Sequence, residues 1–314
     1  MNLANPPFLV IVTGPTSSGK SNLALWLAEM LGGELISCDS MQVYRGMDIG
    51  TAKPSPLERH HITHHLLDFL NIDERFSAGS FVRETDGIIK KIQSHKKVPI
   101  LVGGTGLYLK SLLFGLSTVP EISLATKLNV EEMKSEGGTS LCWERLKELD
   151  PRGASKLHPN DSSRIMRSLE VVISSGKPLS DFQRNDFAGS LRYPIYGMVC
   201  ERPRNELYER INKKTLEMVE QGWIDEVRAL LDVYPEHLKP LQSIGYREII
   251  LYLRGELNES ELIPLIQQRT RHYAKRQLTW FRKQTYLKWK DPDNTQQILE
   301  ECRVCLEKIG QNLA

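Results

Sequence analysis

The sequence contains no long apolar run. Nowhere in its 314 residues does a stretch approach the roughly 18 consecutive apolar residues that a membrane helix needs. The apolar stretch at residues 8–12 is too short for the core of a secretory signal and follows no basic segment. We therefore expect a cytoplasmic protein with no membrane partner.

Cysteine is also scarce, with five residues in the whole chain. An odd number of scattered cysteines excludes a complete disulfide framework and is typical of a reducing compartment. Cys302 and Cys305 form a C-x-x-C pair without a second pair nearby, and we interpret them as one turn of a C-terminal helix. A histidine-rich stretch lacks acids at metal-ligand spacing, so we interpret it as structural or substrate-adjacent; it contains His60, His61, His64 and His65.

Neither sign of charge is in clear excess. The chain has 41 Lys and Arg against 39 Asp and Glu, which leaves a formal charge of +2. A net charge of this size indicates no class of partner, so only the positions of the charges are informative. Hydrophobic residues at 40% and charged residues at 25% are ordinary for a globular protein, and the length allows one large domain or two smaller ones.

Short apolar runs alternate with helix-period segments over the first hundred residues, which predicts a parallel sheet with crossover helices. The runs are residues 9–13, 34–37 and 98–102, and the helical segments are 23–31 and 81–92. The strand pattern disappears between residues 119 and 192 and returns at 193–200. After residue 200 we expect only amphipathic helices, one of which carries Leu207, Ile211, Met218 and Val227 on an apolar face.

A glycine-rich motif follows the first predicted strand and opens the first predicted helix. It matches G-x-x-x-x-G-K-[ST] and consists of Gly14, Pro15, Thr16, Ser17, Ser18, Gly19, Lys20 and Ser21. In a loop of this kind, backbone N–H groups and the helix dipole hold phosphate, the lysine neutralises charge, and the final hydroxyl can ligate Mg²⁺. We therefore expect a P-loop NTPase-like core with helices on both faces of the sheet, with nucleoside triphosphates as the default ligand.

Two features at other strand ends weaken that default. A phosphate-loop NTPase usually has a strand ending in an Asp that helps to hold Mg²⁺, whereas residues 98–102 run into Gly-Gly-Thr-Gly at 103–106. This turn brings Thr105 to the strand ends, where α/β proteins bind ligands. Asp39 also follows a predicted strand, and an acid there can bind a hydroxyl or accept a proton.

Several blocks of the sequence together resemble the bacterial tRNA dimethylallyltransferase family, also called tRNA isopentenyltransferases. The blocks are residues 14–21, 39–54, 103–108, 158–167, 243–248 and 270–282. The resemblance implies a P-loop-like core at residues 1–118 and 193–314 with C-terminal helices, and a helical insertion at 119–192 that grips the anticodon stem-loop. It also implies transfer of a dimethylallyl group from dimethylallyl diphosphate to N6 of the adenosine 3′ to the anticodon, with release of diphosphate and formation of N6-dimethylallyladenosine.

The resemblance also assigns roles to single residues. Asp39 would accept the N6 proton, Thr105 would contact the reacting groups, and Thr16 would lie where the two substrates meet. The phosphate loop would hold the diphosphate, with Mg²⁺ as cofactor bound through Ser21. Because a base stacked in the anticodon loop cannot be reached, the adenosine has to be flipped into a pocket.

Two sets of basic residues are candidates for contact with RNA. Arg164 and Arg167 are three apart after a helix N-cap at Asn160 or Asp161, so they share a helix face. Basic and aromatic residues alternate near the C-terminus and can pair with phosphates and stack on bases. With the residues that the resemblance adds, the expected tRNA contacts are Asp39, Ser40, Met41, Gln42, Ser163, Arg164, Arg167, Gln242, Gly245, Tyr246, Arg247, Lys275 and Arg276.

The chain departs from the family pattern at one place in the insertion. Where the family carries an Arg, this sequence has Ala125 and, nearby, only Lys127. A lysine cannot reproduce the bidentate geometry of an arginine. The resemblance therefore implies one contact with tRNA that Lys127 cannot make in the same geometry, and it leaves the reaction unchanged. We expect the protein to act as a monomer.

Three other functions are compatible with parts of the sequence. In a small-molecule kinase the loop would bind ATP and Asp39 would activate an acceptor hydroxyl, but the insertion and the basic C-terminal region would have no role. A nucleotide-gated RNA-binding module would bind tRNA without altering it. Transfer of the same prenyl group to free adenine nucleotide would use the core but not the insertion.

Overall fold

The computed structural model describes residues 8–116, 119–183 and 190–308. The chain divides into two compact units. The larger unit is Met1–Leu113 with Arg192–Ala314, and the smaller unit is Phe114–Leu191.

The larger unit is built on a six-stranded sheet in the order β3-β2-β4-β1-β5-β6, and each neighbouring pair is parallel. In the register of the central strands, Ile11 lies beside both Leu101 and Gly197. Every residue of β1 is buried, as expected for a central strand covered on both faces. The strands are β1 Leu9–Thr13, β2 Gly33–Ser37, β3 His64–His65, β4 Val98–Gly103, β5 Ile195–Cys200 and β6 Lys288–Lys290.

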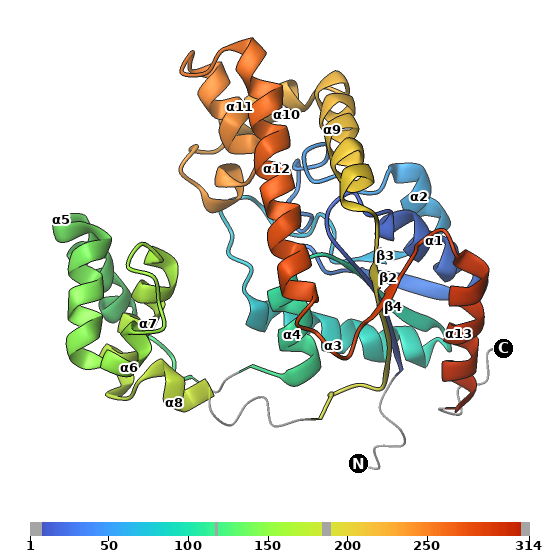
Figure 1. Ribbon diagram of the computed structural model, residues 1–314, viewed down its shortest axis with the longest axis horizontal. Helices are drawn as coiled ribbons and strands as arrows, with labels where there is room; N and C mark the ends of the chain where they lie inside the picture. The colour runs from blue at the N-terminus through green and yellow to red at the C-terminus, as the bar shows by residue number, and fades with distance from the viewer. Residues whose placement is uncertain (1–7, 117–118, 184–189, 309–314) are drawn as a thin grey trace. The chain divides into compact units, whose positions relative to one another are not determined.

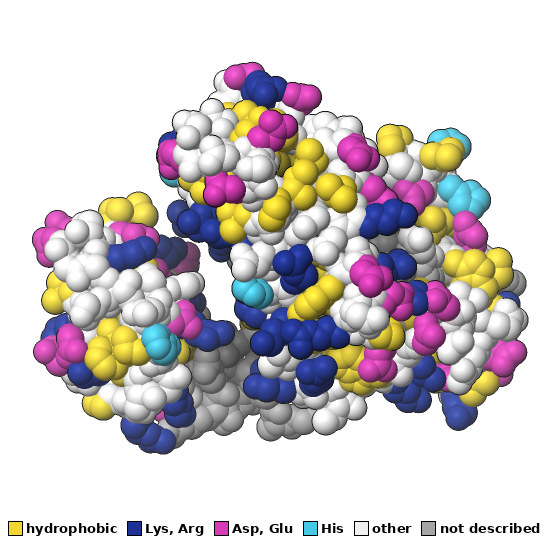
Figure 2. Space-filling model, turned by 45° about the horizontal axis from the view of Figure 1, so that its top comes forward, with side chains coloured by type: hydrophobic (Ala, Val, Ile, Leu, Met, Phe, Trp, Pro, Cys, Tyr) yellow, Lys and Arg dark blue, Asp and Glu magenta, His cyan; other side chains and the backbone are white. Residues whose placement is uncertain are grey.

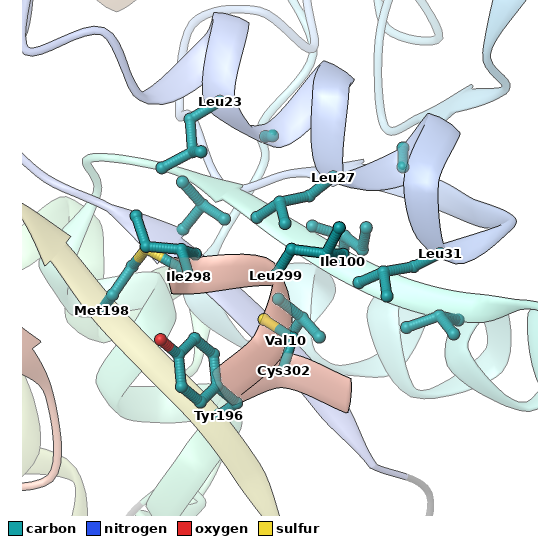
Figure 3. Close-up of a cluster of buried hydrophobic side chains, with 14 of the residues drawn as sticks. Val10, Leu23, Leu27, Leu31, Ile100, Tyr196, Met198, Ile298, Leu299 and Cys302 are labelled. Atoms are coloured by element: carbon teal, nitrogen blue, oxygen red, sulfur yellow. The ribbon is translucent and has the colours of Figure 1, made fainter. Parts of the chain in front are cut away.

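Helices cover both faces of this sheet (Figure 1). Helices α1, Lys20–Leu31, and α13, Thr295–Lys308, pack on one face, whereas α3, Ala78–Ser94, and α4, Gly106–Phe114, lie on the other. Each large aliphatic side chain that becomes buried contributes about 1.5–3 kcal/mol. The cluster below α1 and α13 includes Val10, Leu23, Leu27, Leu31, Ile100, Tyr196, Met198, Ile298, Leu299 and Cys302 (Figure 3).

A helical layer extends the larger unit beyond the sheet. Its core includes Val43, Met47, Trp223 and Tyr246. The segment after β2 therefore packs against helices more than 170 residues later in the chain, and Asp48 N also donates to Glu226 across this distance. Its elements are α9 Arg204–Glu220, α10 Trp223–Leu231, the 3₁₀ helix η1 Lys239–Gln242, α11 Tyr246–Leu253 and α12 Glu259–Phe281. Helix α2, Pro56–His61, precedes β3.

Two details of the sequence-based prediction were wrong. The apolar face expected to run from Leu207 to Val227 is divided between α9 and α10, because Gly222 takes the left-handed backbone angle φ 98° and redirects the chain. The segment after residue 200 is not helical throughout, since β6 pairs with β5. A three-residue edge strand with two lysines lacks the apolar alternation that predicts a strand.

The smaller unit is helical in its described residues. It comprises α5 Leu124–Leu149, α6 Pro151–Ala154, α7 Ser162–Ser175 and α8 Leu179–Gln183. Gly138, at φ 67°, interrupts α5, and the core joins α5 to α7 through Val130, Leu146, Ile165 and Leu169. The predicted α/β fold with a parallel sheet and a helical insertion is thus confirmed. Within the described part of the chain, no helix combines the length and apolarity needed to cross a bilayer.

Candidate active site

The glycine-rich loop connects the end of β1 to the first residue of α1. Gly19 precedes the helix in a left-handed conformation at φ 92°, which glycine adopts at little cost. At Gly14 a Cβ atom would lie 2.9 Å from Ser18 Oγ and 3.2 Å from the Cβ of Cys200. The two fixed glycines of the motif are therefore required here, one for its backbone angle and one for the close approach of β5.

The loop presents a cation and a hydroxyl that lacks a hydrogen-bond partner within the described part of the chain, and both suit an anionic oxygen ligand. Lys20 Nζ donates to the Pro15 carbonyl at 3.1 Å; burial lowers the pKa of Lys20, and the nearby Asp39 carboxylate opposes that shift. Ser18 Oγ is buried without a hydrogen-bond partner in the described residues, which is costly unless a ligand supplies one. Ser21 is exposed in the first turn of α1, so its hydroxyl and phosphate oxygens could together hold Mg²⁺.

Two arginines near the loop were not found from the sequence. Arg210 of α9 donates from Nε to the Ser17 carbonyl at 2.9 Å, and its Nη2 lies 3.8 Å from where a Cβ on Gly19 would be. Arg202 Nη2 lies 3.7 Å from the same point, with its guanidinium paired to Asp293. Because 193 residues separate Ser17 from Arg210, no local pattern could have indicated this contact.

The second glycine turn meets the strand-end acid on the neighbouring strand. Strands β2 and β4 are adjacent, and Thr105 N donates to the Cys38 carbonyl at 3.1 Å while Thr105 Oγ1 accepts from Ser40 N at 3.2 Å. Asp39 Oδ1 accepts from Met41 N at 2.8 Å and, more weakly, from Gln42 N at 3.3 Å. The structure therefore brings Asp39 and Thr105 together, and the Thr105 hydroxyl keeps its proton available for donation.

Gln42 is part of the framework of this turn. Its Oε1 accepts from Ser37 Oγ at 2.9 Å, and its Nε2 donates to the Thr51 carbonyl at 3.1 Å. Its amide is thus engaged by the protein, so it holds residues 51–52 beside the segment that begins at Asp39.

A single amide joins the two turns. Thr16 N donates to Gln277 Oε1 at 3.0 Å, and Gln277 Nε2 donates to the Gly104 carbonyl at 3.0 Å. Gln277 lies near the C-terminal end of α12, which ends beside α4 (Figure 1). We did not predict this residue as part of the site, because a glutamine within a basic helix has no distinctive pattern.

Comparison with known proteins identifies the family. The family model described as IPP transferase matches residues 42–284, which is more than half of the chain. The chain belongs to the IPP transferase family.

Relatives and solved structures of the family cover most of the chain. The tRNA dimethylallyltransferase of Geobacter sulfurreducens is 46% identical over 282 residues, covering 90% of this chain and 91% of that protein. A structure of the full-length tRNA isopentenylpyrophosphate transferase from Bacillus halodurans is 34% identical, with a TM-score of 0.72 and coverage of 98% and 99%. A eukaryotic dimethylallyltransferase acting on tRNA is 26% identical, with a TM-score of 0.81 and coverage of 96% and 79%.

In the larger unit of this IPP transferase, the residues predicted to contact tRNA differ in accessibility. Lys275 and Arg276 are exposed on α12, and Gln242 and Arg247 are exposed near α11. Lys and Arg side chains gather on the face of this unit seen in Figure 2. Gly245 and Tyr246, in contrast, are buried, and the Tyr246 hydroxyl donates to Glu226 Oε1 at 2.6 Å.

In the smaller unit, the predicted basic residues lie on α7. The Asp161 side chain caps this helix by accepting from Arg164 N, which confirms one of the two predicted N-caps. Ser163, Arg164 and Arg167 are exposed, and the two arginines pair with acids on their own helix at about 3 Å. At the position where the resemblance led us to expect an Arg, Ala125 is exposed and Lys127 is half-buried in the first turn of α5.

The histidine-rich stretch makes structural contacts. His65 Nε2 lies 2.7 Å from Glu34 Oε2, and Lys97 pairs with the same carboxylate at 2.7 Å. His64 Nδ1 lies 2.7 Å from the Ile62 carbonyl. The described residues contain no group of three or more His, Cys, Asp or Glu able to hold a metal ion. Cys302 lies on α13, with its side chain in the core between this helix and the sheet.

Proposed function

We propose that this chain transfers the dimethylallyl group of dimethylallyl diphosphate to N6 of the adenosine 3′-adjacent to the anticodon of tRNA. A bond forms between N6 and C1 of the donor as the bond from C1 to the diphosphate oxygen breaks. Diphosphate leaves, the N6 proton passes to a base, and N6-dimethylallyladenosine remains in the tRNA.

The observation that carries this proposal is that Asp39 and Thr105 lie together beside the phosphate loop. All three follow the carboxyl ends of the adjacent strands β2, β4 and β1, the edge at which α/β proteins bind their ligands. An anion site and a strand-end acid therefore face one reaction space. A leaving diphosphate can lie on one side of it and a nucleophile that has to lose a proton on the other.

On the acceptor side, Asp39 is held in place for proton transfer. The amine of adenine is a poor nucleophile because its lone pair is delocalised into the ring, so a positioned base raises the rate by roughly 10²–10⁴. The N–H groups of Met41 and Gln42 fix Asp39 Oδ1. Asp39 Oδ2 accepts no hydrogen bond from the described residues, so it can take the proton.

On the donor side, fixed charges meet the charge that develops on the diphosphate. The ammonium of Lys20, the guanidinium of Arg210 and the first N–H groups of α1 surround the loop, and preorganised groups of this kind stabilise developing negative charge. Ser21 Oγ would help to hold Mg²⁺, which, when bound, neutralises further charge on the leaving group.

Exposed basic residues are suited to hold the RNA. Lys275 and Arg276 on α12 and Arg164 and Arg167 on α7 can each neutralise a phosphate, which makes affinity dependent on salt. The target base has to leave its stack to reach Asp39, at a cost of a few kcal/mol.

Incubation of the protein with unmodified tRNA, Mg²⁺ and dimethylallyl diphosphate, followed by nucleoside analysis, tests the proposal. The expected product is N6-dimethylallyladenosine, absent when the donor is omitted. AMP in place of tRNA tests whether the free nucleotide serves as acceptor. Phosphoryl transfer from ATP to a small acceptor, with no altered nucleoside in tRNA, would instead assign the site to a kinase.

Asp39→Asn tests whether Asp39 acts in proton transfer or in binding of the donor. The amide keeps a similar shape but cannot accept the N6 proton, so we expect kcat to fall by roughly 10²–10⁴ while the affinity for dimethylallyl diphosphate stays nearly constant. Single-turnover kinetics and equilibrium binding of the donor provide the two measurements. A large loss of donor affinity would place Asp39 on the Mg²⁺ side of the site instead.

A further inference from the structure

Gln277 makes two hydrogen bonds that connect parts of the site far apart in sequence. Its Oε1 accepts from the N–H of Thr16, in the phosphate loop, and its Nε2 donates to the carbonyl of Gly104, in the second glycine turn. Both distances are 3.0 Å, and the residue is only 7% exposed. A buried amide that satisfies one donor and one acceptor at once is held firmly in its orientation.

The packing around this amide is tight. A Cβ atom on Gly104 would lie 2.4 Å from Gln277 Nε2 and 3.1 Å from the Gly14 carbonyl oxygen. One residue earlier on each side, Thr13 Oγ1 donates to the Gly103 carbonyl at 2.6 Å within the buried sheet edge. The two turns are thus joined by hydrogen bonds, and those of Gln277 reach Thr16 on one side and the residue before Thr105 on the other.

The same face of α12 holds a second contact with the glycine turn. Trp280, nearly one helical turn after Gln277, packs on Gly106, where a Cβ atom would lie 2.7 Å from the indole. Lys275 and Arg276 are exposed on the same helix, and Lys275, two residues before Gln277, lies on nearly the opposite side from it. One helix therefore carries exposed basic residues and also contacts the second glycine turn through Gln277 and Trp280.

We propose that Gln277 is a positioning residue that sets the distance between the donor-binding loop and the acceptor-binding turn. The inference rests on the proposed prenyl transfer, in which the phosphate loop holds the diphosphate and Asp39 and Thr105 receive the adenine. Each turn binds its own ligand without Gln277. The amide instead acts on the alignment of the two ligands, for which a misplacement of about 1 Å can cost roughly 10²-fold in rate.

The first test is Gln277→Met, which keeps the volume of the side chain but removes both hydrogen bonds. We expect kcat in single-turnover prenylation of tRNA to fall about 10- to 100-fold. The separate dissociation constants for dimethylallyl diphosphate and for tRNA should each change less than about threefold. The matched control is Gln267→Met on the same helix, since Gln267 donates to the Asn212 carbonyl at 3.1 Å, away from both turns; it should retain wild-type kcat.

The second test, Gln277→Glu, depends on pH in a way that loss of packing would not. An ionised Glu can accept from Thr16 but repels the Gly104 carbonyl, whereas a protonated Glu restores one donor and one acceptor. Burial at this position raises the pKa of the introduced carboxyl group. The ratio of variant to wild-type kcat should therefore rise several-fold as the pH falls from about 8 to about 6.

The outcomes separate this inference from the proposed function. If wild-type protein prenylates tRNA and Gln277→Met has a kcat within twofold of it, the inference is wrong. A loss of kcat that Gln267→Met shares, or a ratio for Gln277→Glu that does not vary with pH, also overturns it. If Gln277→Met does not fold, the pH dependence of the Glu variant decides. Absence of product with wild-type protein refutes the proposed function itself.

Discussion

At the residue scale, Lys20 and Asp39 bring opposite charges close together in the site. Burial lowers the pKa of Lys20, and Asp39 is close enough to oppose this shift. The Lys20 ammonium is satisfied in part by the Pro15 carbonyl. A desolvated ammonium beside a phosphate loop gains more from a diphosphate than a solvated one would, because the ligand replaces the interactions that burial removed.

The lowered pKa of Lys20 predicts two opposite effects of alkaline pH. Affinity for dimethylallyl diphosphate should fall as the pH rises through the lowered pKa, because the charged form binds the ligand. In the unliganded protein, the unfolded chain binds more protons than the folded one between the lowered and the ordinary pKa, so the free energy of unfolding should rise with pH over that window. Donor binding and chemical denaturation across an alkaline series provide the measurements.

Lys20→Met is the control for both effects. At neutral pH it should bind the donor about 10- to 100-fold more weakly, since a hydrogen bond to a charged group is worth about 1.5–3 kcal/mol. Its affinity should not decline further in alkali, so the difference from wild type should shrink as the pH rises. An alkaline loss of affinity that persists in the variant would mean that another group titrates.

At the scale of elements, one carboxylate ties a loop to two helices. Glu226 of α10 accepts from the N–H groups of Asp48, Ile49 and Gly50 at 2.9, 2.6 and 3.2 Å. It also accepts from the Tyr246 hydroxyl of α11. The loop at 48–50 continues into residues 51–52, which Gln42 binds. The carboxylate thereby connects α10 and α11 to the segment that begins at Asp39.

We expect Glu226→Gln to destabilise this connection. The amide nitrogen cannot accept from an N–H group, so at least one donor of the loop is left without a partner. This should lower the free energy of unfolding by about 1–3 kcal/mol. The KM for tRNA should rise while the affinity for dimethylallyl diphosphate stays the same. Asp225→Asn is the matched control, because the Asp225 side chain is 77% exposed and pairs only with Arg228 among the described residues. This substitution should change the free energy of unfolding by no more than about 0.5 kcal/mol. Equal effects of the two substitutions on stability and KM would contradict this role.

At the scale of the whole molecule, the two chain ends of the larger unit meet at the point where the smaller unit is inserted. Arg192 N donates to the Leu113 carbonyl at 2.8 Å, so the two ends that flank the smaller unit are in direct contact. The Arg192 guanidinium donates to the Leu112 carbonyl at 2.9 Å and pairs with Asp86. Each unit has its own buried core, which is the usual condition for independent folding.

Excision of residues 114–191, with a short Gly-Ser link from Leu113 to Arg192, should therefore leave a folded protein. We expect cooperative unfolding and nearly unchanged affinity for dimethylallyl diphosphate, because the phosphate loop and its neighbours remain. Product formation on tRNA should be lost, since Arg164 and Arg167 are removed with the smaller unit. Full activity of the shortened chain on tRNA would show that the smaller unit does not grip the RNA.

Much of the core and part of the site could be predicted from the sequence because the signals are local. The strand predicted at residues 9–13 is β1, and the glycine motif needs only eight consecutive residues and the elements beside it. Asp39 and Thr105 were predicted because each directly follows a strand. Short edge strands such as β6 were missed because their pairing, rather than their composition, makes them strands.

The sequence by itself determined the α/β fold, the phosphate loop and the two strand-end residues, since these depend on periodicity and on residues next to one another. Only the tertiary structure decided which distant side chains complete the site. Gln277 is 261 residues from Thr16 and 173 from Gly104, and Tyr246 is buried where the family resemblance suggests a contact with RNA. Such contacts arise from the packing of helices on the sheet, and no local pattern records which face a side chain will meet.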